Sequence, residues 1–293
     1  MRFSTYPYIN KNMKITISTL CDAKKQGRKF SVVSCYDYVS AKLSAAAGVD
    51  VLLAGDSASQ FTLGFDSTLP VTMDFMVAIT AGVKRAAADL LIVADMPFEG
   101  CRNGAAETVK NAKRFVSESG ADIVKIEIVQ ANLETIKAVV DAGVAVMPHL
   151  GIRPQTGQYK AEGTTAEVAA EIIALAEQMC SAGAKMLLLE GMAREAAKII
   201  TEKLPIPIIS CGSGPDCDGQ VLVLPDILNL TGGAVPKFSK SFADIGKASI
   251  EAISLYDMQI KQGVFPDDSH SYHMKSGELE KLSNMIGSKE VKR

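Results

Sequence analysis

"LLAGDSASQFTLGFDSTLP", residues 52–70, begins like a buried strand and ends like a loop. The apolar run stops at Gly-Asp-Ser, and a second Gly-Phe-Asp-Ser follows inside the loop. A short apolar run of this kind is typical of a parallel strand that is covered on both faces. What the acids do there depends on whether other strands of the chain end in the same way.

Strand-like and helix-like segments alternate along the whole chain. Short apolar runs such as "ADIVKIE" (121–127) precede segments such as "NLETIKAVVDAG" (132–143), in which apolar residues recur every three or four positions before a Gly. We expect seven such pairs, the last with a weak helix after Gly214, then an eighth short strand within 228–240 and a last barrel helix at 244–263. No Gly-x-Gly-x-x-Gly follows the first strand, which argues against a dinucleotide-binding open sheet. The pattern predicts an α/β fold, a single-domain (β/α)8 TIM barrel.

The two ends of the chain differ in composition from the middle. Residues 1–12 read as a loose N-terminal extension, residues 13–264 as the barrel, and residues 265–293 as a polar C-terminal surface segment and tail. The first residues contain no apolar signal region, and no apolar run approaches the roughly 20 residues of a membrane span. We therefore expect no membrane association.

Charge and cysteine content limit the class of protein further. The net charge is −2, with Lys and Arg scattered among acids and no basic stripe, so we expect no nucleic-acid partner. The six cysteines form no C-x-x-C pair and fit reduced thiols in a cytoplasmic protein.

In a (β/α)8 barrel the carboxyl ends of the strands form the active-site face. Read only at those ends, the chain shows a ring of polar residues: Tyr36, Asp37, Asp56, Ser57, Asp95, Lys125, Glu127, His149, Glu190 and Ser213. A single acid at such a place is usually a helix cap or a loop charge. Several carboxylates at one mouth repel each other, which raises their pKa values, and a bound cation relieves the repulsion.

Three of these acids, Asp56, Asp95 and Glu127, offer only oxygen ligands. Oxygen ligation suits a hard ion such as Mg²⁺, whereas zinc prefers His or Cys donors, and only His149 is near. Lys125 and Glu127 are two residues apart on one strand, so their side chains share a face and both can reach the mouth.

Glu190 and His149 each have two readings. Glu190 ends "KMLLLE", and a carboxylate in such an apolar setting is a candidate general base, although it could equally cap the next helix. His149, in "MPHLG", is either a site residue or a histidine of the core.

The motifs "GDS" and "GFDSTLPVT", "ADMPF", "VKIE", "HLGIRPQ", "LLLE" and "DGQVLVLPDIL" occur in one order between about residues 14 and 273. Together they resemble the ketopantoate hydroxymethyltransferase family, which belongs to the phosphoenolpyruvate mutase/isocitrate lyase group of barrels. The resemblance implies transfer of a one-carbon unit from 5,10-methylenetetrahydrofolate to 3-methyl-2-oxobutanoate, giving ketopantoate for pantothenate and coenzyme A. It also implies a homo-oligomer, often a decamer.

The resemblance implies a role for each candidate residue. Asp56, Asp95 and Glu127 would hold Mg²⁺, the first two partly through water. Asp56, Ser57, Asp95, Lys125 and His149 would line the 2-oxo acid site, and Glu190 would take the proton from C3 as the catalytic base.

The chain departs from the family pattern at Ala58–Ser59, Ile128–Val129 and Pro225 and in a short segment at 156–158. Two other functions therefore stay open. One is a Mg²⁺-dependent enzyme of the same barrel group that makes or breaks a bond beside a 2-oxo acid without folate. The other is a barrel that binds a 2-oxo acid but does not catalyse.

Overall fold

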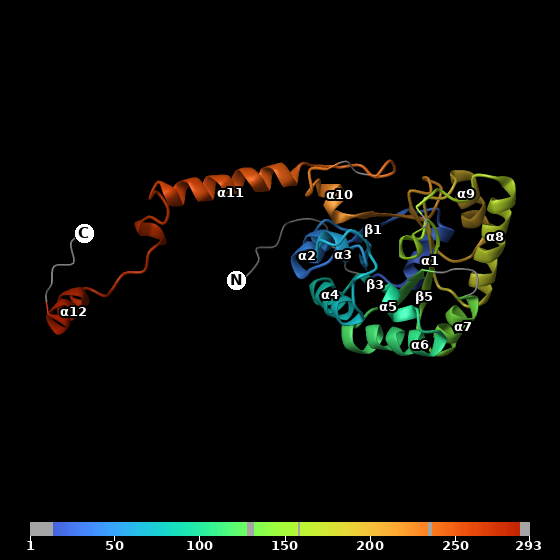
Figure 1. Ribbon diagram of the computed structural model, residues 1–293, viewed down its shortest axis with the longest axis horizontal. Helices are drawn as coiled ribbons and strands as arrows, with labels where there is room; N and C mark the ends of the chain where they lie inside the picture. Colours follow the sequence, from blue (N-terminus) through green and yellow to red (C-terminus); the bar gives the residue numbers. More distant parts are fainter. Residues whose placement is uncertain (1–13, 128–131, 158, 234–235, 288–293) are drawn as a thin grey trace. The chain divides into compact units, whose positions relative to one another are not determined.

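Within the described residues, eight parallel strands form a closed barrel in which each strand pairs with the next and β8 pairs with β1 (Figure 1). The computed structural model describes residues 14–127, 132–157, 159–233 and 236–287. The strands are β1 (Phe30–Ser34), β2 (Val51–Ala54), β3 (Leu91–Asp95), β4 (Ile123–Glu127), β5 (Val146–Gly151), β6 (Leu187–Glu190), β7 (Ile208–Cys211) and β8 (Gly219–Val223). The predicted TIM barrel is confirmed.

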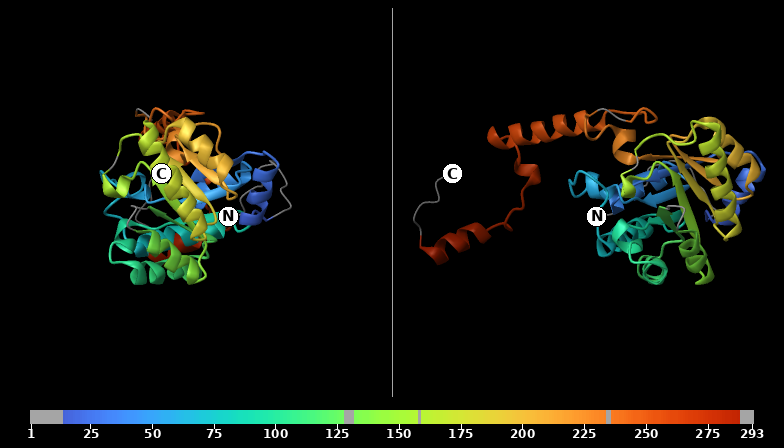
Figure 2. Two further views of the ribbon diagram at one scale, coloured as in Figure 1. Left: turned by 90° about the vertical axis from the view of Figure 1, so that its right-hand side faces the viewer. Right: turned by 45° about the vertical axis from the view of Figure 1, so that its right-hand side comes forward.

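Helices surround these strands (Figure 2). They are α1 (Ile17–Lys25), α2 (Tyr38–Ala46), α3 (Ala58–Phe61), α4 (Met73–Ala86), α5 (Phe98–Cys101), α6 (Ala105–Arg114) with the π-helical η1 (Phe115–Ser119), α7 (Leu133–Asp141), the 3-10 helix η3 (Pro154–Thr156), α8 (Ala166–Ser181), α9 (Arg194–Lys203) and α10 (Leu224–Leu228). Side-chain caps begin several of them: Asp37 accepts hydrogen bonds from the first turn of α2, Thr72 from α4 and Thr165 from α8.

The barrel interior is apolar up to the last layer of each strand. Side chains alternate between the two faces of a strand, so the positions that share a face with Leu91, Ile123 and Met147 point inward. They form one buried cluster: Leu20, Phe30, Val32, Val51, Leu53, Leu91, Val93, Ile123, Met147, Met186, Leu188, Ile209 and Val221. Leu20 comes from α1, which precedes the first strand and closes the amino end of the barrel. The same alternation carries Asp95, Lys125 and His149 into the layer above.

The eighth strand lies earlier than predicted. It is formed by Gly219–Val223 and not by residues 228–240, and no helix separates it from β7. Gly219 allows this pairing because a Cβ there would lie 2.3 Å from the Phe30 ring, so only Gly fits the seam between β8 and β1. The apolar "QVLV" run is the strand signal that the sequence reading passed over.

The chain divides into two compact units, Met1–Ala243 and Asp244–Arg293. The helix predicted at 244–263 is present as α11 (Ile245–Lys261) and lies in the second unit, which also contains η4 (Asp268–His270) and α12 (Glu278–Ile286). The predicted end of the barrel domain at residue 264 stays a prediction. The helix that follows β8 in the first unit is the short α10, whose Leu224 and Ile227 pack against the cluster beneath α2 and α4. The predicted extension at 1–12 lies outside the described residues.

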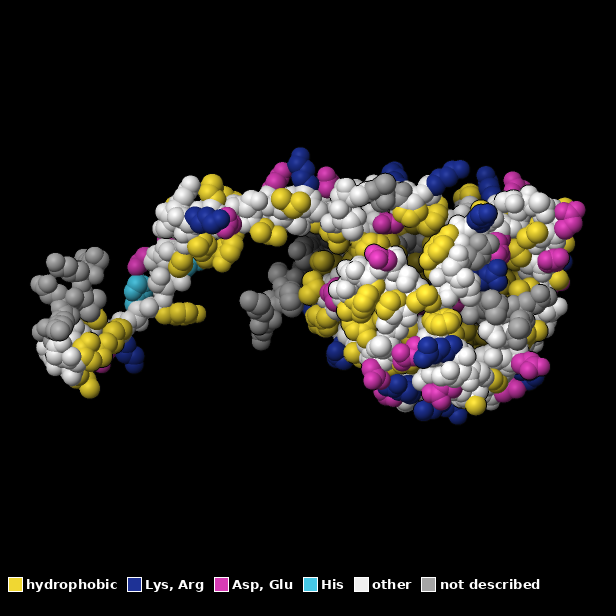
Figure 3. Space-filling model, in the orientation of Figure 1, with side chains coloured by type: hydrophobic (Ala, Val, Ile, Leu, Met, Phe, Trp, Pro, Cys, Tyr) yellow, Lys and Arg dark blue, Asp and Glu magenta, His cyan; other side chains and the backbone are white. Residues whose placement is uncertain are grey.

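The surface carries charges of both signs, and the cysteines form no disulfide in the described residues. On the face of the barrel unit drawn in Figure 3, acidic and basic side chains are intermixed. All six cysteines are free thiols. In the described part of the chain, no helix has the length and apolar character required to cross a membrane.

Candidate active site

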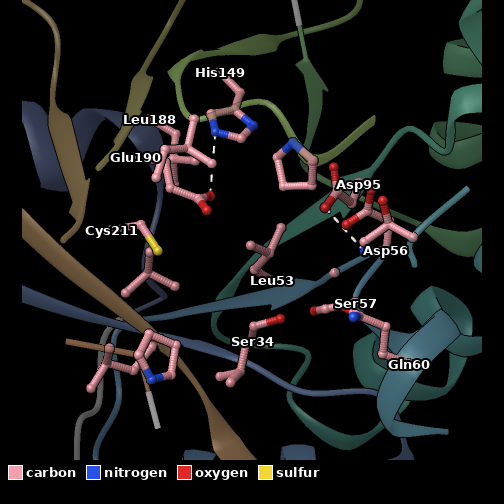
Figure 4. Close-up of a pocket in the computed structure, with 18 of the residues that line it drawn as sticks. Ser34, Leu53, Asp56, Ser57, Gln60, Asp95, His149, Leu188, Glu190 and Cys211 are labelled. Carbon is pink, nitrogen blue, oxygen red and sulfur yellow. Dashed lines mark hydrogen bonds and ion pairs between the residues drawn. The ribbon is translucent and has the colours of Figure 1, made fainter. Parts of the chain in front are cut away.

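A cavity of about 510 Å³ opens at the carboxyl ends of the strands (Figure 4). The candidate residues from the sequence all line it: Asp56, Ser57, Asp95, Lys125, Glu127, His149 and Glu190. In Figure 4, Glu190 and His149 lie on one side of the cavity, Asp56 and Asp95 lie on the other, and Leu53 lies between them at its floor. The barrel thus brings these candidate side chains together from four strands, β3 to β6, and from the β2–α3 turn.

A buried ion pair forms the acidic side of the cavity. Lys125 Nζ lies 2.8 and 2.7 Å from the two carboxylate oxygens of Asp95, and both side chains are buried. The backbone N–H of Asp56 donates a third hydrogen bond to Asp95 Oδ2 at 3.0 Å. Burial and then the nearby Asp56 raise the pKa of Asp95, while Lys125 opposes the rise. Burial alone would lower the pKa of Lys125, but the surrounding carboxylates raise it overall, so this lysine stays charged.

Gln155, which the sequence reading did not single out, joins the other two acids. It lies in η3, and its backbone N–H donates to Glu127 Oε1 at 3.0 Å. Its side-chain amide donates to Asp56 Oδ2 at 2.8 Å and to the Met96 carbonyl at 3.0 Å. Burial raises the pKa of Glu127 to about 8, with a smaller opposing effect of Lys125. The only sequence signal for Gln155 is its place at the end of "HLGIRPQ", beyond a strand end.

His149 lies between two glutamates. Its Nδ1 is 3.7 Å from Glu127 Oε2 and its Nε2 is 3.4 Å from Glu190 Oε2. Neither ring nitrogen has a well-formed hydrogen bond to a described residue, which argues against the reading of a satisfied core histidine. Burial and the charge of Lys125 lower the pKa of His149, so the ring is neutral and can act as donor or acceptor toward Glu190.

Glu190 is the most accessible carboxylate of the group. Its side chain is 21% exposed, against 2% for Asp95 and 3% for Glu127. The alternative reading as a helix cap fails, because α9 begins after Ala193 and has no side-chain cap hydrogen bond. Leu188 and Cys211 lie beside Glu190 (Figure 4), and burial raises the pKa of the Cys211 thiol. Glu190 is therefore a partly exposed carboxylate at an apolar edge.

Hydroxyl groups lie near Asp56, and those of Ser57 and Thr68 line the cavity. Tyr36 Oη and Ser57 Oγ are 2.8 Å apart, and burial raises the pKa of Tyr36, which keeps its hydroxyl protonated. The Thr68 hydroxyl is buried in the same cavity with no hydrogen-bond partner in the described part of the chain. These neutral hydroxyls can donate hydrogen bonds to an anionic oxygen of a ligand without adding charge to the site.

The acids fit a hard divalent cation by donor type and by charge. Asp56, Asp95 and Glu127 offer oxygens alone, and Lys125 is the one basic side chain among the described residues of the cavity lining. The described residues contain no group of three His, Cys, Asp or Glu side chains arranged as a ready-made metal site. Lys125 bonds to Asp95, and the Gln155 amide bonds to Asp56. This arrangement suits Mg²⁺ held in part through water, which is how proteins commonly bind that ion.

Comparison with solved structures defines the class of barrel. A 2,3-dimethylmalate lyase, described as a PEP mutase/isocitrate lyase superfamily member, aligns with a TM-score of 0.57 at 19% identity, covering 93% of this chain and 99% of its own. A phosphonopyruvate hydrolase in complex with oxalate and Mg²⁺ aligns with a TM-score of 0.59 at 12% identity, covering 92% and 96%. At these identities the likeness shows the fold alone.

Comparison with sequences defines the family. The family model of ketopantoate hydroxymethyltransferase matches residues 14–268. Proteins named 3-methyl-2-oxobutanoate hydroxymethyltransferase are similar to this chain. The one from Thermoanaerobacter sp. (strain X514) is 41% identical over 269 residues, which cover 90% of this chain and 98% of the relative. The one from Trichlorobacter lovleyi is 43% identical over 263 residues, which cover 88% of this chain and 98% of the relative. The chain belongs to the ketopantoate hydroxymethyltransferase family of transferases, as its motifs predicted.

The structure describes some of the departures from the family pattern. Ala58 and Ser59 are fully buried in α3, directly after Ser57, and Pro225 is buried at the start of α10. The positions 128–129 and Gln158 lie outside the described residues. None of the departures removes a candidate ligand or the candidate base.

We expect Lys125→Met to lower the free energy of unfolding by roughly 3–5 kcal/mol, because it leaves the buried Asp95 carboxylate without its countercharge. The double variant Lys125→Met/Asp95→Asn should regain part of this loss. Urea denaturation followed by circular dichroism measures both. As a control, Lys137→Met removes the exposed pair with Asp141 and should cost less than about 1 kcal/mol. A double variant no more stable than Lys125→Met would contradict the assigned role of the pair.

Proposed function

We propose that this chain is a 3-methyl-2-oxobutanoate hydroxymethyltransferase that uses 5,10-methylenetetrahydrofolate and Mg²⁺ to make ketopantoate. One observation carries the proposal: an accessible carboxylate, Glu190, faces a buried cation and acidic cluster across one cavity. The base and the charged cluster thus lie on opposite sides of the cavity. A 2-oxo acid has the same division, because its oxygens are anionic or electron-rich and its C3 carries the proton to be removed. Family membership supports the same reaction.

The cavity orients such a substrate by polarity. The carboxylate and the 2-oxo oxygen are proposed to lie toward Lys125 and the hydroxyl of Ser57, where positive charge and a neutral donor are available. The alkyl part then lies against Leu188 and Cys211. Glu190, next to those two side chains, is the carboxylate closest to where C3 would be.

Glu190 is proposed to take the proton from C3 as a general base. The neutral His149 ring, whose Nε2 lies 3.4 Å from Glu190 Oε2, is proposed to orient the carboxylate once the substrate is bound. Lys125 places a fixed positive charge beside the oxygen on which negative charge develops. Mg²⁺, held by Asp56, Asp95 and Glu127, would add Lewis acidity on the same side. Water is proposed to add to the methylene carbon of the folate, whose two C–N bonds break as N5 and N10 regain protons, so that tetrahydrofolate leaves and a formaldehyde-level carbon remains. The C3 carbanion attacks that carbon, and its oxygen takes the proton held by Glu190 to become the hydroxyl of the product.

The other functions predict different chemistry at the same cavity. An enzyme of this barrel group without folate would also exchange the C3 proton but would not bind a reduced folate. A barrel without catalysis would bind the 2-oxo acid and exchange nothing. Family membership favours the transferase over both.

The test of the enolising step is nuclear magnetic resonance of 3-methyl-2-oxobutanoate in D₂O with Mg²⁺ and then with EDTA, without folate. We expect Mg²⁺-dependent loss of the C3 proton signal. Glu190→Gln should slow this exchange by roughly 10²–10⁴-fold while Mg²⁺ titration stays as in the wild type, since a general base contributes about that much.

Glu195→Gln is the matched control, because Glu195 is an exposed carboxylate in the first turn of α9. Its exchange rate should equal that of the wild type. Exchange retained by Glu190→Gln would remove Glu190 as the base, and no exchange by the wild type with this or other 2-oxo acids would leave only the binding function.

Cys211 should help to select the size of the substrate alkyl group. Cys211→Leu fills the space beside Leu188 and is expected to lower C3 exchange of 3-methyl-2-oxobutanoate at least roughly tenfold relative to 2-oxobutanoate, which lacks one methyl group. Cys180→Leu, in α8 and away from the cavity, is the control. An unchanged ratio of the two exchange rates would place the alkyl group elsewhere.

The expected homo-oligomer, the cytoplasmic location and the absence of a nucleic-acid partner stay predictions. Sedimentation velocity of the purified chain tests the first of them.

A further inference from the structure

The segment after β5 leaves the end of its own strand and returns to the end of β6. It leaves at Ile152, whose backbone N–H donates to the Glu190 carbonyl at 2.8 Å. It returns at Glu162, whose N–H donates to the Gly191 carbonyl at 3.2 Å. The described residues of 152–162, the β5 loop, are thus attached at both ends to the strand end that carries the candidate base.

Two glycines allow the start of the β5 loop to lie close to β6. A Cβ at Gly151 would lie 2.0 Å from the Glu190 carbonyl oxygen, and one at Gly191 would lie 2.2 Å from Ile152 Cδ1. Gly151 also has φ +97°, a backbone conformation that side chains rarely adopt. The start of the loop is therefore packed directly on the backbone beside Glu190.

An ion pair joins the two ends of the β5 loop. Arg153 Nη2 donates to Glu162 Oε1 at 2.7 Å, and the two side chains are 26% and 15% exposed. Arg153 Nε is buried and has no hydrogen-bond partner in the described part of the chain. Because a guanidinium removed from water is costly without a countercharge, loss of Glu162 would leave an uncompensated charge here. The pair is therefore expected to keep the loop closed.

Gln155 lies inside this loop and reaches the acids across the mouth of the barrel. Arg153 is the residue before η3, and the Thr156 N–H donates back to its carbonyl at 3.0 Å. Gln155 is 4% exposed, and its backbone N–H and side-chain amide bond to Glu127 and Asp56. The donors that place two candidate cation ligands thus come from a loop whose ends are joined by the ion pair.

A second ion pair of similar exposure lies away from the cavity. Lys84 Nζ is 2.7 Å from Asp122 Oδ2, and the two side chains are 20% and 26% exposed. Asp122 directly precedes β4, at the amino end of that strand, and neither side chain lines the cavity. This pair therefore provides a comparison in which a similar contact is lost far from the acids.

We propose that the Arg153–Glu162 ion pair positions the cation and substrate site by closing the β5 loop. The closed loop holds Gln155 against the carboxylates of Asp56 and Glu127. The inference rests on the proposed function, because it takes these carboxylates to bind Mg²⁺ beside the 2-oxo acid. The two residues of the pair are positioning residues, which touch neither the cation nor the substrate and act through Gln155.

The first measurement is calorimetric titration of Mg²⁺ into the full chain in the presence of 3-methyl-2-oxobutanoate. We expect Arg153→Met and Glu162→Gln each to raise the Mg²⁺ dissociation constant roughly tenfold, the lower end of the effect of residues that orient metal ligands. Arg153→Lys keeps the charge and should recover most of the affinity. Lys84→Met is the matched control, which should bind Mg²⁺ as the wild type does although it loses an ion pair of similar exposure.

Deuterium exchange at C3 separates positioning from a general loss of stability. At saturating Mg²⁺ and 2-oxo acid, Arg153→Met should exchange within about threefold of the wild type, because Glu190 and His149 keep their places in the strands. In a Gln155→Leu background, Arg153→Met should weaken Mg²⁺ binding less than it does alone, since residues that act through one another are not additive.

The outcomes for this inference and for the proposed function are distinct. If the wild type binds Mg²⁺ and exchanges the C3 proton while Arg153→Met and Glu162→Gln keep its affinity, this inference falls and the proposed function stands. An equal loss of affinity in Lys84→Met would also overturn it, because the effect would then be one of stability. If the wild type binds no Mg²⁺, both the cation site and this inference fall. A selective loss of affinity that Arg153→Lys restores supports both.

Discussion

The site depends on keeping the Lys125–Asp95 ion pair buried at the mouth of a closed barrel. Two charges removed from water are costly unless each finds full compensation. The compensation comes from separate parts of the chain: the Asp56 backbone N–H bonds to Asp95, and the Gln155 amide bonds to Asp56. The turn after β2 and the segment after β5 are thereby tied to β3 and β4. The acids that are proposed to bind the cation and the substrate owe their positions to this network.

The strand ends of β6 and β7 form an apolar half of the mouth, in contrast to the charged half at β3 and β4. There Leu188, Gly191, Cys211 and Gly212 leave apolar space, and one accessible carboxylate, Glu190, stands at its edge. In the proposed pose, a base in this place would lie close to C3 of the substrate and apart from the charges that would hold its oxygens. The neutral His149 lies between the two regions and adds no charge to either. The division of the mouth into a charged half and an apolar half follows from which strands supply which residues.

The period-two alternation of a strand was enough to predict that Lys125 and Glu127 point into the barrel together, and apolar runs ending in acids located the active-site face. Other parts depended on tertiary packing that the sequence does not display. Gln155 acquires its role only because η3 folds back over the acids. The strand β8 fits beside β1 because Gly219 makes room for the Phe30 ring, whereas Phe238 belongs to a segment read as strand and instead lies over Gly212. Loops that return to the barrel mouth carry little periodic signal of their own.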